Sequence, residues 1–173
     1  MQVRQCVPAD VEAVTALYDK VTLHLEQTVN YPRWEYGVYP SASTVRTAVD
    51  AGVQYLCEDG GAVVGAFILN DDPQGAYGRG EWKTCLQLGK FLVIHTLAVD
   101  PDRAGQGIGR YMVRACVEYA SARGLGAIRL DVVPDNLPAR RLYEKMGFTF
   151  AGEKDLERGI DGIPRFALYE LNF

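Results

Sequence analysis

A glycine-rich turn is the part of this sequence whose residue types and spacing best suit chemistry. Glycines alternate with other residues through Gly105–Gly109, between the apolar run Phe91–Val99 and a segment with helical apolar spacing that starts at Ile108. The turn therefore joins a predicted strand to a predicted helix. The first N–H groups of a helix have no partner inside it, and the positive end of the helix dipole lies behind them. This pattern predicts a binding site for an anionic group such as a pyrophosphate.

Two familiar phosphate-binding motifs do not fit the turn. The dinucleotide fingerprint G-x-G-x-x-G fails because counting from Gly105 or Gly107 places Arg110 or Met112 where the third glycine belongs. A Walker A loop requires Gly-Lys-Ser/Thr, which does not occur here. Spacing thus excludes both alternatives.

A second motif lies further along the chain. Residues 136–148 follow the pattern N-x-x-A-x-x-L-Y-x-x-x-G-F, with Asn136, Ala139, Leu142, Tyr143, Gly147 and Phe148 at its defined positions. Together with Leu97-Ala98-Val99-Asp100-Pro101 and Gly105-Gln106-Gly107-Ile108-Gly109-Arg110, this motif resembles the GNAT superfamily of N-acetyltransferases. The resemblance covers residues 91–152, with both motifs in the order that the family shows.

The resemblance implies an enzyme that uses acetyl-CoA as acetyl donor. It would acetylate a primary amine, on a small molecule or a peptide N-terminus, by direct attack in a ternary complex. No metal is expected, because the cysteines and histidines show no metal-ligand spacing. The residues implied to bind the cofactor are Leu97, Ala98, Val99, Gly105, Gln106, Gly107, Ile108, Gly109, Arg110, Asn136 and Tyr143. The alternative is a non-catalytic acyl-CoA-binding regulatory module.

One position departs from the family pattern. The family has Gln or Arg three residues before the first glycine of its G-x-G pair, and this chain has Ala104 there. Arg103 lies one residue earlier and could substitute if its side chain bends back. Since backbone amides are expected to contribute most of the pyrophosphate binding, the turn keeps its predicted role.

The same resemblance assigns the proton-transfer residues. The counterpart of Tyr143 points at the cofactor sulfur, and a phenol with a pKa of about 10 stays protonated and able to donate at neutral pH. The alternative is a tyrosine that only packs on its helix. Asp131 matches the acidic position that accepts a proton in relatives similar to ribosomal-protein acetyltransferases, and an apolar strand favours uptake of a proton by a carboxylate. His95 and water are the rival bases.

Two further positions have both a binding and a structural interpretation. Asn136 matches the residue that bonds the pantetheine arm, but it could equally cap the next helix. Backbone groups of Leu97 and Val99 resemble those that pair with the pantetheine amides, and an amide near Leu97 would stabilise an oxyanion.

The elements that must position these residues follow from apolar periodicity and from turn residues. Strands are predicted at 2–7, 53–58, 62–69, 91–99, 127–133, 148–152 and 165–171, and helices from Asp10, from Ser41 or Ser43, from Ile108 and at Pro138–Met146. The side chains of Asp10 and of either Ser41 or Ser43 are expected to cap the first two helices, and Gly147 is expected to end the last one. This order predicts a single α/β (α+β) domain over residues 1–173. The resemblance specifies a mostly antiparallel mixed sheet of six to seven strands with about four helices, splayed between the fourth and fifth strands.

Two segments have no regular period. Residues 71–90 are long for a connection and are either a functional lid or a mobile loop. The loop 30–40 is rich in aromatic residues, which either hold a cationic amine or pack an irregular loop. With the segment around Tyr77 and Trp82, the resemblance makes this loop the acceptor site, whose members would be Tyr31, Trp34, Glu35, Tyr36 and Tyr39.

Composition limits the remaining choices. The net charge of −4 and the pI near 5.2 argue against a nucleic-acid partner. The sequence shows no membrane-length apolar run and no leader, so a soluble, cytoplasmic protein is expected. Cys57 and Cys116 lie in apolar segments and are expected to be buried thiols. The resemblance leaves a homodimer open.

Overall fold

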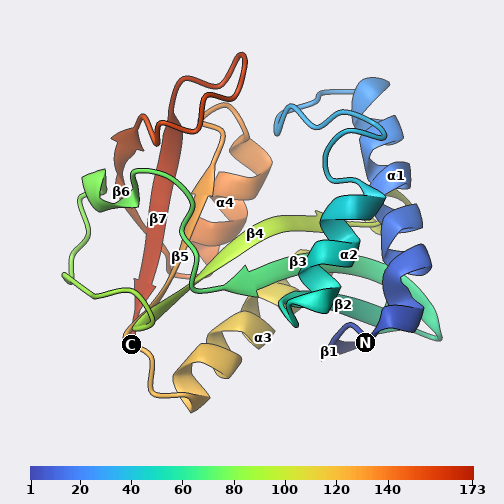
Figure 1. Cartoon of the computed structure of the whole chain (residues 1–173), viewed down its shortest axis with the longest axis horizontal. Coiled ribbons are helices and arrows are strands. Elements are labelled where there is room, and N and C mark those ends of the chain that lie inside the picture. The colour runs from blue at the N-terminus through green and yellow to red at the C-terminus, as the bar shows by residue number, and fades with distance from the viewer. The chain divides into compact units, whose positions relative to one another are not determined.

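The computed structural model describes residues 1–173 and contains seven strands and four α-helices (Figure 1). In chain order they are β1 Gln2–Gln5, α1 Val11–Glu26, α2 Ala42–Asp50, β2 Gln54–Asp59, β3 Ala62–Asn70, β4 Phe91–Val99, α3 Ile108–Ala122, β5 Ala127–Val132, α4 Leu137–Lys145, β6 Thr149–Lys154 and β7 Phe166–Asn172. Three short 3-10 helices, η1 Pro8–Asp10, η2 Tyr77–Arg79 and η3 Pro101–Arg103, interrupt the connections. The predicted elements are all present, with ends that differ by a few residues.

The strands form one sheet in the order β1-β2-β3-β4-β5-β7-β6. The pairs β1–β2, β2–β3, β5–β7 and β6–β7 are antiparallel, whereas β4 pairs with β5 in parallel from Phe91 beside Ala127 to Ile94 beside Leu130. The predicted class, a mixed and mostly antiparallel α+β sheet, is confirmed. The predicted splay between β4 and β5 stays a prediction.

The chain divides into two compact units. The N-terminal unit comprises residues 1–69 and 95–115, and the C-terminal unit comprises residues 70–94 and 116–173. Both β4 and α3 therefore run from one unit into the other. The assignment of residues 1–173 to one domain stays a prediction. None of the helices combines the length and the apolar character that a membrane crossing requires.

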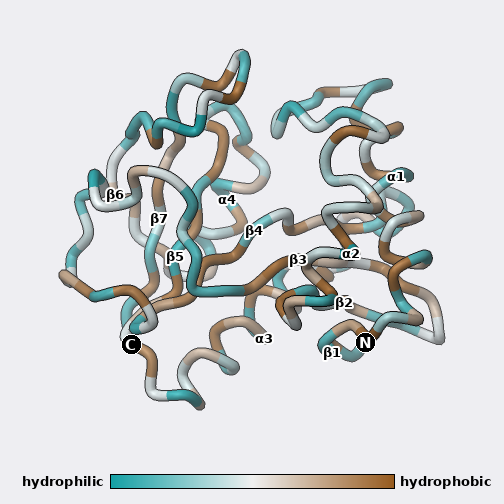
Figure 2. Tube along the Cα trace, viewed as in Figure 1, coloured by the Kyte–Doolittle hydropathy of each residue, from teal (hydrophilic) through white to brown (hydrophobic).

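In the N-terminal unit, α1 and α2 bury their apolar faces on the sheet. Val14, Leu17, Tyr18 and Val21 recur at helical spacing in α1, and all four side chains are buried. Figure 2 shows the resulting alternation of hydrophobic and hydrophilic residues along this helix. The α1 side chains share one core cluster with α2 and with residues of β2, β3 and β4.

The helix starts in this unit agree only partly with the predictions. Ser41 begins α2 as predicted, because its hydroxyl accepts the N–H of Thr44. Asp10 stands at the start of α1, but the prediction that its side chain caps this helix is wrong. Its carboxylate instead accepts the N–H of Val7 at 2.8 Å and the Arg4 guanidinium at 2.7 Å. A charged partner nearby thus replaces the helix amides as donors.

In the C-terminal unit, part of the irregular connection between β3 and β4 packs on the hydrophobic core. Tyr77 is buried, and Trp82 and Leu86 pack against the same core cluster as Phe91 and Leu168. The Tyr77 and Trp82 rings stack at 5.2 Å, and the Trp82 indole donates to the Tyr77 carbonyl at 2.8 Å. Part of the segment 71–90, predicted to be a functional lid or a mobile loop, thus packs on the core, although most of its residues are exposed. A role as a lid stays a prediction.

Candidate active site

The glycine turn has the backbone conformation that an anion site requires. Gly105 and Gly107 adopt φ of +78° and +81°, a region that L side chains rarely occupy. A Cβ built at either position would have no atom within 4 Å. These glycines are therefore required by backbone conformation, and the space beside them is open to a ligand.

The helix that follows the turn presents unpaired amides. Its first backbone bond to the turn runs from the Tyr111 N–H to the Gly107 carbonyl at 3.0 Å. The amides of Ile108, Gly109 and Arg110 therefore have no acceptor within the helix, and they lie at its positive end. The buried Ile108 side chain anchors this end, while Arg110 is exposed. Open space, free donors and positive potential fit a pyrophosphate.

A lysine from α1 offsets the acidic residues beside the turn. Lys20 Nζ lies 2.6 Å from Asp100 and 2.8 Å from Asp102. The Asp100 carboxylate also accepts the Asp102 N–H at 2.9 Å, which fixes η3 just before the turn. Partial burial opposes ionisation, but the hydrogen bond from Lys20 holds the pKa of Asp100 below its usual value. Sequence reasoning missed Lys20, since no local pattern links it to a loop far along the chain.

Arg103 has partners that differ from its predicted role near Ala104. Its guanidinium lies 3.7 Å from Asp59 and donates to Gln106 Oε1 at 3.5 Å. The side chain is thus shared between the β2–β3 turn and Gln106. Its substitution for the missing Gln or Arg side chain stays a prediction.

A strained residue lies in the middle of β4. Thr96 has φ +47°, which is rare for a β-branched residue. The buried Tyr18 hydroxyl donates to the Thr96 carbonyl at 3.0 Å and lies 3.2 Å from Thr96 Oγ1. Such strain persists only where its surroundings impose it, and it often marks a functional site. It directly precedes Leu97, the residue whose amide is predicted to stabilise an oxyanion.

Tyr143 lies on α4 in the C-terminal unit with 7% of its surface exposed. Its ring packs edge-on at 5.7 Å against Phe148, which lies beyond the end of α4. Burial raises the pKa of Tyr143 above its ordinary value, with smaller contributions from Cys116 and Asp131. The phenol is therefore protonated at neutral pH, as an acid or hydrogen-bond donor requires.

Asn136 caps α4. Its side-chain oxygen accepts the Ala139 N–H at 3.2 Å, as one of its two interpretations predicted. The side-chain NH₂ group keeps two donors. Binding of the pantetheine arm by Asn136 stays a prediction.

Asp131 forms an ion pair that sequence reasoning did not foresee. Both carboxylate oxygens accept from the Arg158 guanidinium, at 2.7 and 2.8 Å, in a two-bond arrangement. Neither side chain is more than 13% exposed. The rival base His95 is half-buried in β4. No group of three or more His, Cys, Asp or Glu side chains lies close enough together to hold a metal ion.

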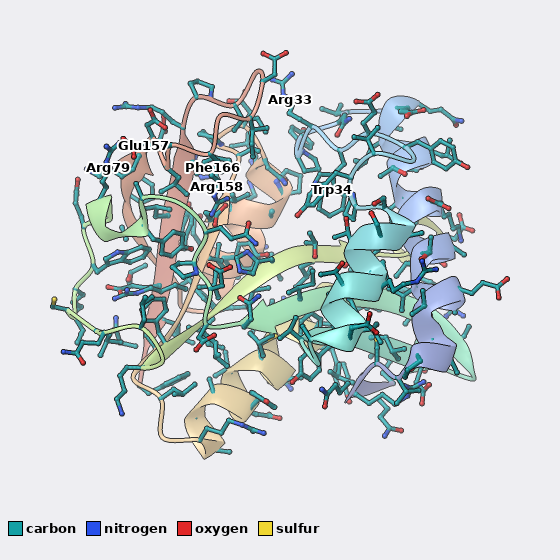
Figure 3. The ribbon with its side chains drawn as sticks, viewed as in Figure 1. Arg33, Trp34, Arg79, Glu157, Arg158 and Phe166 are labelled. Carbon is teal, nitrogen blue, oxygen red and sulfur yellow. The ribbon has the colours of Figure 1, made fainter.

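The aromatic loop contributes to both packing and surface. Trp34 packs edge-on against Tyr18 at 6.1 Å and Tyr39 at 6.4 Å, as part of the N-terminal core (Figure 3). Tyr36 and Tyr39 are 49% and 43% exposed, and Glu35 is also exposed. Packing therefore accounts for Trp34, and binding of a cationic amine by the exposed residues stays a prediction.

Fold and turn together define a class of α+β proteins in which a strand, a glycine turn and a helix follow one another directly. Residues 16–148 match the acetyltransferase (GNAT) family, so this chain belongs to that family. Streptothricin acetyltransferase from Streptomyces lavendulae is 38% identical over 79 residues, which are 45% of this chain and 42% of the relative. The chain spans less than half the length of the curated relatives it matches.

Solved structures show the same fold. A GNAT-family acetyltransferase from Streptococcus agalactiae superposes with a TM-score of 0.81 at 16% identity, over 99% of this chain and 95% of the other. The protein yncA from Salmonella typhimurium, solved with its cofactor acetyl-CoA, superposes with a TM-score of 0.71 at 19% identity, over 99% of this chain and 93% of the other. The expected family and fold are thus confirmed.

Proposed function

We propose that this protein transfers the acetyl group of acetyl-CoA to a primary amine, by direct attack of the amine within a ternary complex. The observation that carries the proposal is the pair of left-handed glycines, Gly105 and Gly107, opening onto the free amides of α3. Gln106 and Arg110 flank these amides on an exposed surface. Membership of the GNAT family supports acetyl-CoA as the ligand.

When bound, acetyl-CoA supplies a thioester whose departing thiolate corresponds to a thiol of pKa about 8.5. Tyr143 has an ordinary pKa of about 10, and burial raises it further. Complete proton transfer from Tyr143 to that thiolate is therefore uphill by at least about 2 kcal/mol. Tyr143 thus serves best by donating a hydrogen bond to the sulfur as its charge develops.

Backbone groups of β4 would hold the other reacting parts. Leu97, Ala98 and Val99 would align the pantetheine arm as an added strand does, with Asn136 as a further donor. The Leu97 N–H would donate to the thioester oxygen as negative charge grows there. The left-handed Thr96, bound by Tyr18, supports this role because it reorients the peptide group that carries this N–H.

The acceptor must lose a proton, since a free alkyl amine has a pKa of about 10.4. Asp131, His95 and water remain the candidate bases. A small molecule is the preferred acceptor, supported by the similarity to a streptothricin acetyltransferase. The exposed Tyr36 and Tyr39 beside Glu35 would suit its cationic group.

A panel of amines, with thiol release as readout and calorimetry of acetyl-CoA alongside, tests this function. We expect micromolar acetyl-CoA affinity and thiol release with at least one small amine. Tight binding without release across the whole panel would favour a regulatory acyl-CoA-binding module instead. In Tyr143→Phe, loss of one hydrogen bond to a charged sulfur should cost about 1.5–3 kcal/mol, or about 10- to 150-fold in turnover. Acetyl-CoA affinity should stay unchanged, and unchanged turnover would remove Tyr143 from the mechanism.

A further inference from the structure

Arg158 binds three separate parts of the C-terminal unit at once. Besides both oxygens of Asp131 on β5, its guanidinium donates to the Gln74 carbonyl at 3.0 Å and to the Pro73 carbonyl at 3.0 Å. It also lies 4.8 Å from the centre of the Phe166 ring, and Figure 3 shows the two side chains together. Four of its five N–H groups are thereby used on fixed acceptors.

The two loops that Arg158 joins are also bonded to each other. The Ala76 N–H donates to the Leu156 carbonyl at 2.9 Å, and Arg79 pairs with Glu157 and donates to the Asp155 carbonyl. A Cβ on Gly75 would lie 2.2 Å from the Leu156 oxygen, so glycine permits this close approach. Residues 73–79 and 155–158 thus form one double loop, and the Arg158–Asp131 pair attaches it to the sheet.

The same pair lies beside a tyrosine of the segment expected to contact the acceptor. Tyr77 belongs to the double loop and is buried. Burial, and then the negative charge of Asp131, raise the pKa of Tyr77 well above its ordinary value. Its hydroxyl is therefore held neutral next to the ion pair.

From these contacts we infer that Arg158 is a positioning residue, which sets the double loop 73–79/155–158 for the acceptor amine through Asp131. Protonation of Asp131 would remove the charge that holds a nearly buried guanidinium, which disfavours Asp131 among the three candidate bases. The acceptor amine named in this inference depends on the proposed acetyl transfer, whereas the positioning role of Arg158 depends on the observed ion pair.

A double-mutant cycle on Arg158 and Asp131 tests this role, with the exposed Arg165→Ala as a control for charge in the same connection. We expect Arg158→Ala and Asp131→Asn each to raise KM for the amine at least tenfold and to change acetyl-CoA affinity less than threefold. The kcat of Arg158→Ala should also change less than threefold. The double variant should be no worse than either single one. Arg158→Lys should be intermediate, because one ammonium group cannot reach Asp131 and both carbonyls together.

Hydrogen exchange of residues 74–79 in the folded variants supplies a readout that needs no substrate. Faster exchange in Arg158→Ala and Arg158→Lys, but not in Arg165→Ala, is expected. Unchanged exchange in both Arg158 variants would overturn the inference. So would a hundredfold loss of kcat in Asp131→Asn with a normal Arg158→Ala, because that result identifies Asp131 as the base. If the wild-type protein acetylates no amine, the proposed function fails. The exchange experiment still shows whether the Arg158–Asp131 pair holds the double loop in place.

Discussion

Replacement of Gly107 separates the two reasons for which a glycine could stand in the turn. With φ at +81° and no atom within 4 Å of a Cβ, an alanine at this position meets strain but no collision. Left-handed backbone costs an L-residue about 1–2 kcal/mol, and asparagine tolerates it better than alanine. The expected penalty of Gly107→Ala is thus conformational.

That penalty should lower either the free energy of unfolding or the affinity for acetyl-CoA. If the free protein keeps the turn, the free energy of unfolding falls by about 1–2 kcal/mol and acetyl-CoA affinity is unchanged. If the turn relaxes instead, stability is retained and the dissociation constant rises about 5- to 30-fold, since 1.4 kcal/mol is tenfold. The two losses together should equal about 1–2 kcal/mol, with a smaller total for Gly107→Asn.

Urea denaturation and calorimetric titration with acetyl-CoA measure both losses on the same preparations. Gly78→Ala is the matched control, because Gly78 also has open space but no positive φ. Gly107→Trp should abolish binding by filling the space beside the amides. The reasoning is refuted if Gly107→Ala equals wild type in both measurements, or if Gly107→Asn is the worse variant. Retained affinity in Gly107→Trp would refute the pyrophosphate assignment itself.

Three further predictions concern a buried ion pair, a partly exposed ion pair and an exposed thiol. Glu170→Ala leaves Arg129, which is 3% exposed, without its ion-pair partner and should lower the free energy of unfolding by about 3–5 kcal/mol. Most of this loss should be recovered when both residues are replaced by Met. An unshifted urea midpoint in Glu170→Ala would contradict this prediction. Arg4 lowers the pKa of Asp10 to about 2, so the pair stabilises the fold above the unfolded pKa of about 3.9 and loses this effect as the pH falls through about 2. The stability advantage over Asp10→Asn, about 1 kcal/mol after solvent screening, should therefore shrink from pH 5 to pH 2, and a constant difference would argue against the pair. Cys85 is exposed, whereas the other three free cysteines are buried. A thiol reagent should therefore label one thiol per folded chain in the wild type and none in Cys85→Ser. The Cys85→Ser variant should then be used in the thiol-release assay, because its own thiols do not react with the reagent.

Local residue patterns predicted much of the fold from the sequence. The apolar run of β4 was predicted at its observed limits, Phe91–Val99, because a strand covered on both faces has few polar residues. Ser41 begins α2 because a hydroxyl there reaches an amide three residues on, and Gly147 follows α4 with φ +89° because glycine tolerates that turn. Buried Cys57 and Cys116 likewise follow from their apolar neighbours.

Sequence patterns did not identify the partners that several side chains find in the fold. Asp10 was expected to cap a helix, but Arg4 and the Val7 amide bind its carboxylate. The segment 71–90 lacks any period, yet Tyr77 and Trp82 pack it onto the sheet. A pattern within one segment cannot show which other segment supplies its partner.

The sequence by itself determined the GNAT family, the α+β class and the glycine turn, because these depend on residue types at short, fixed spacings. Only the tertiary structure decided which charged and polar groups contact one another. It placed Lys20 on the acidic residues before the turn and Tyr18 on the strained Thr96. It also gave Asp131 a guanidinium partner from a loop 27 residues away. Ion pairs and hydrogen bonds act over a few ångströms of space, and only the folded chain sets those distances.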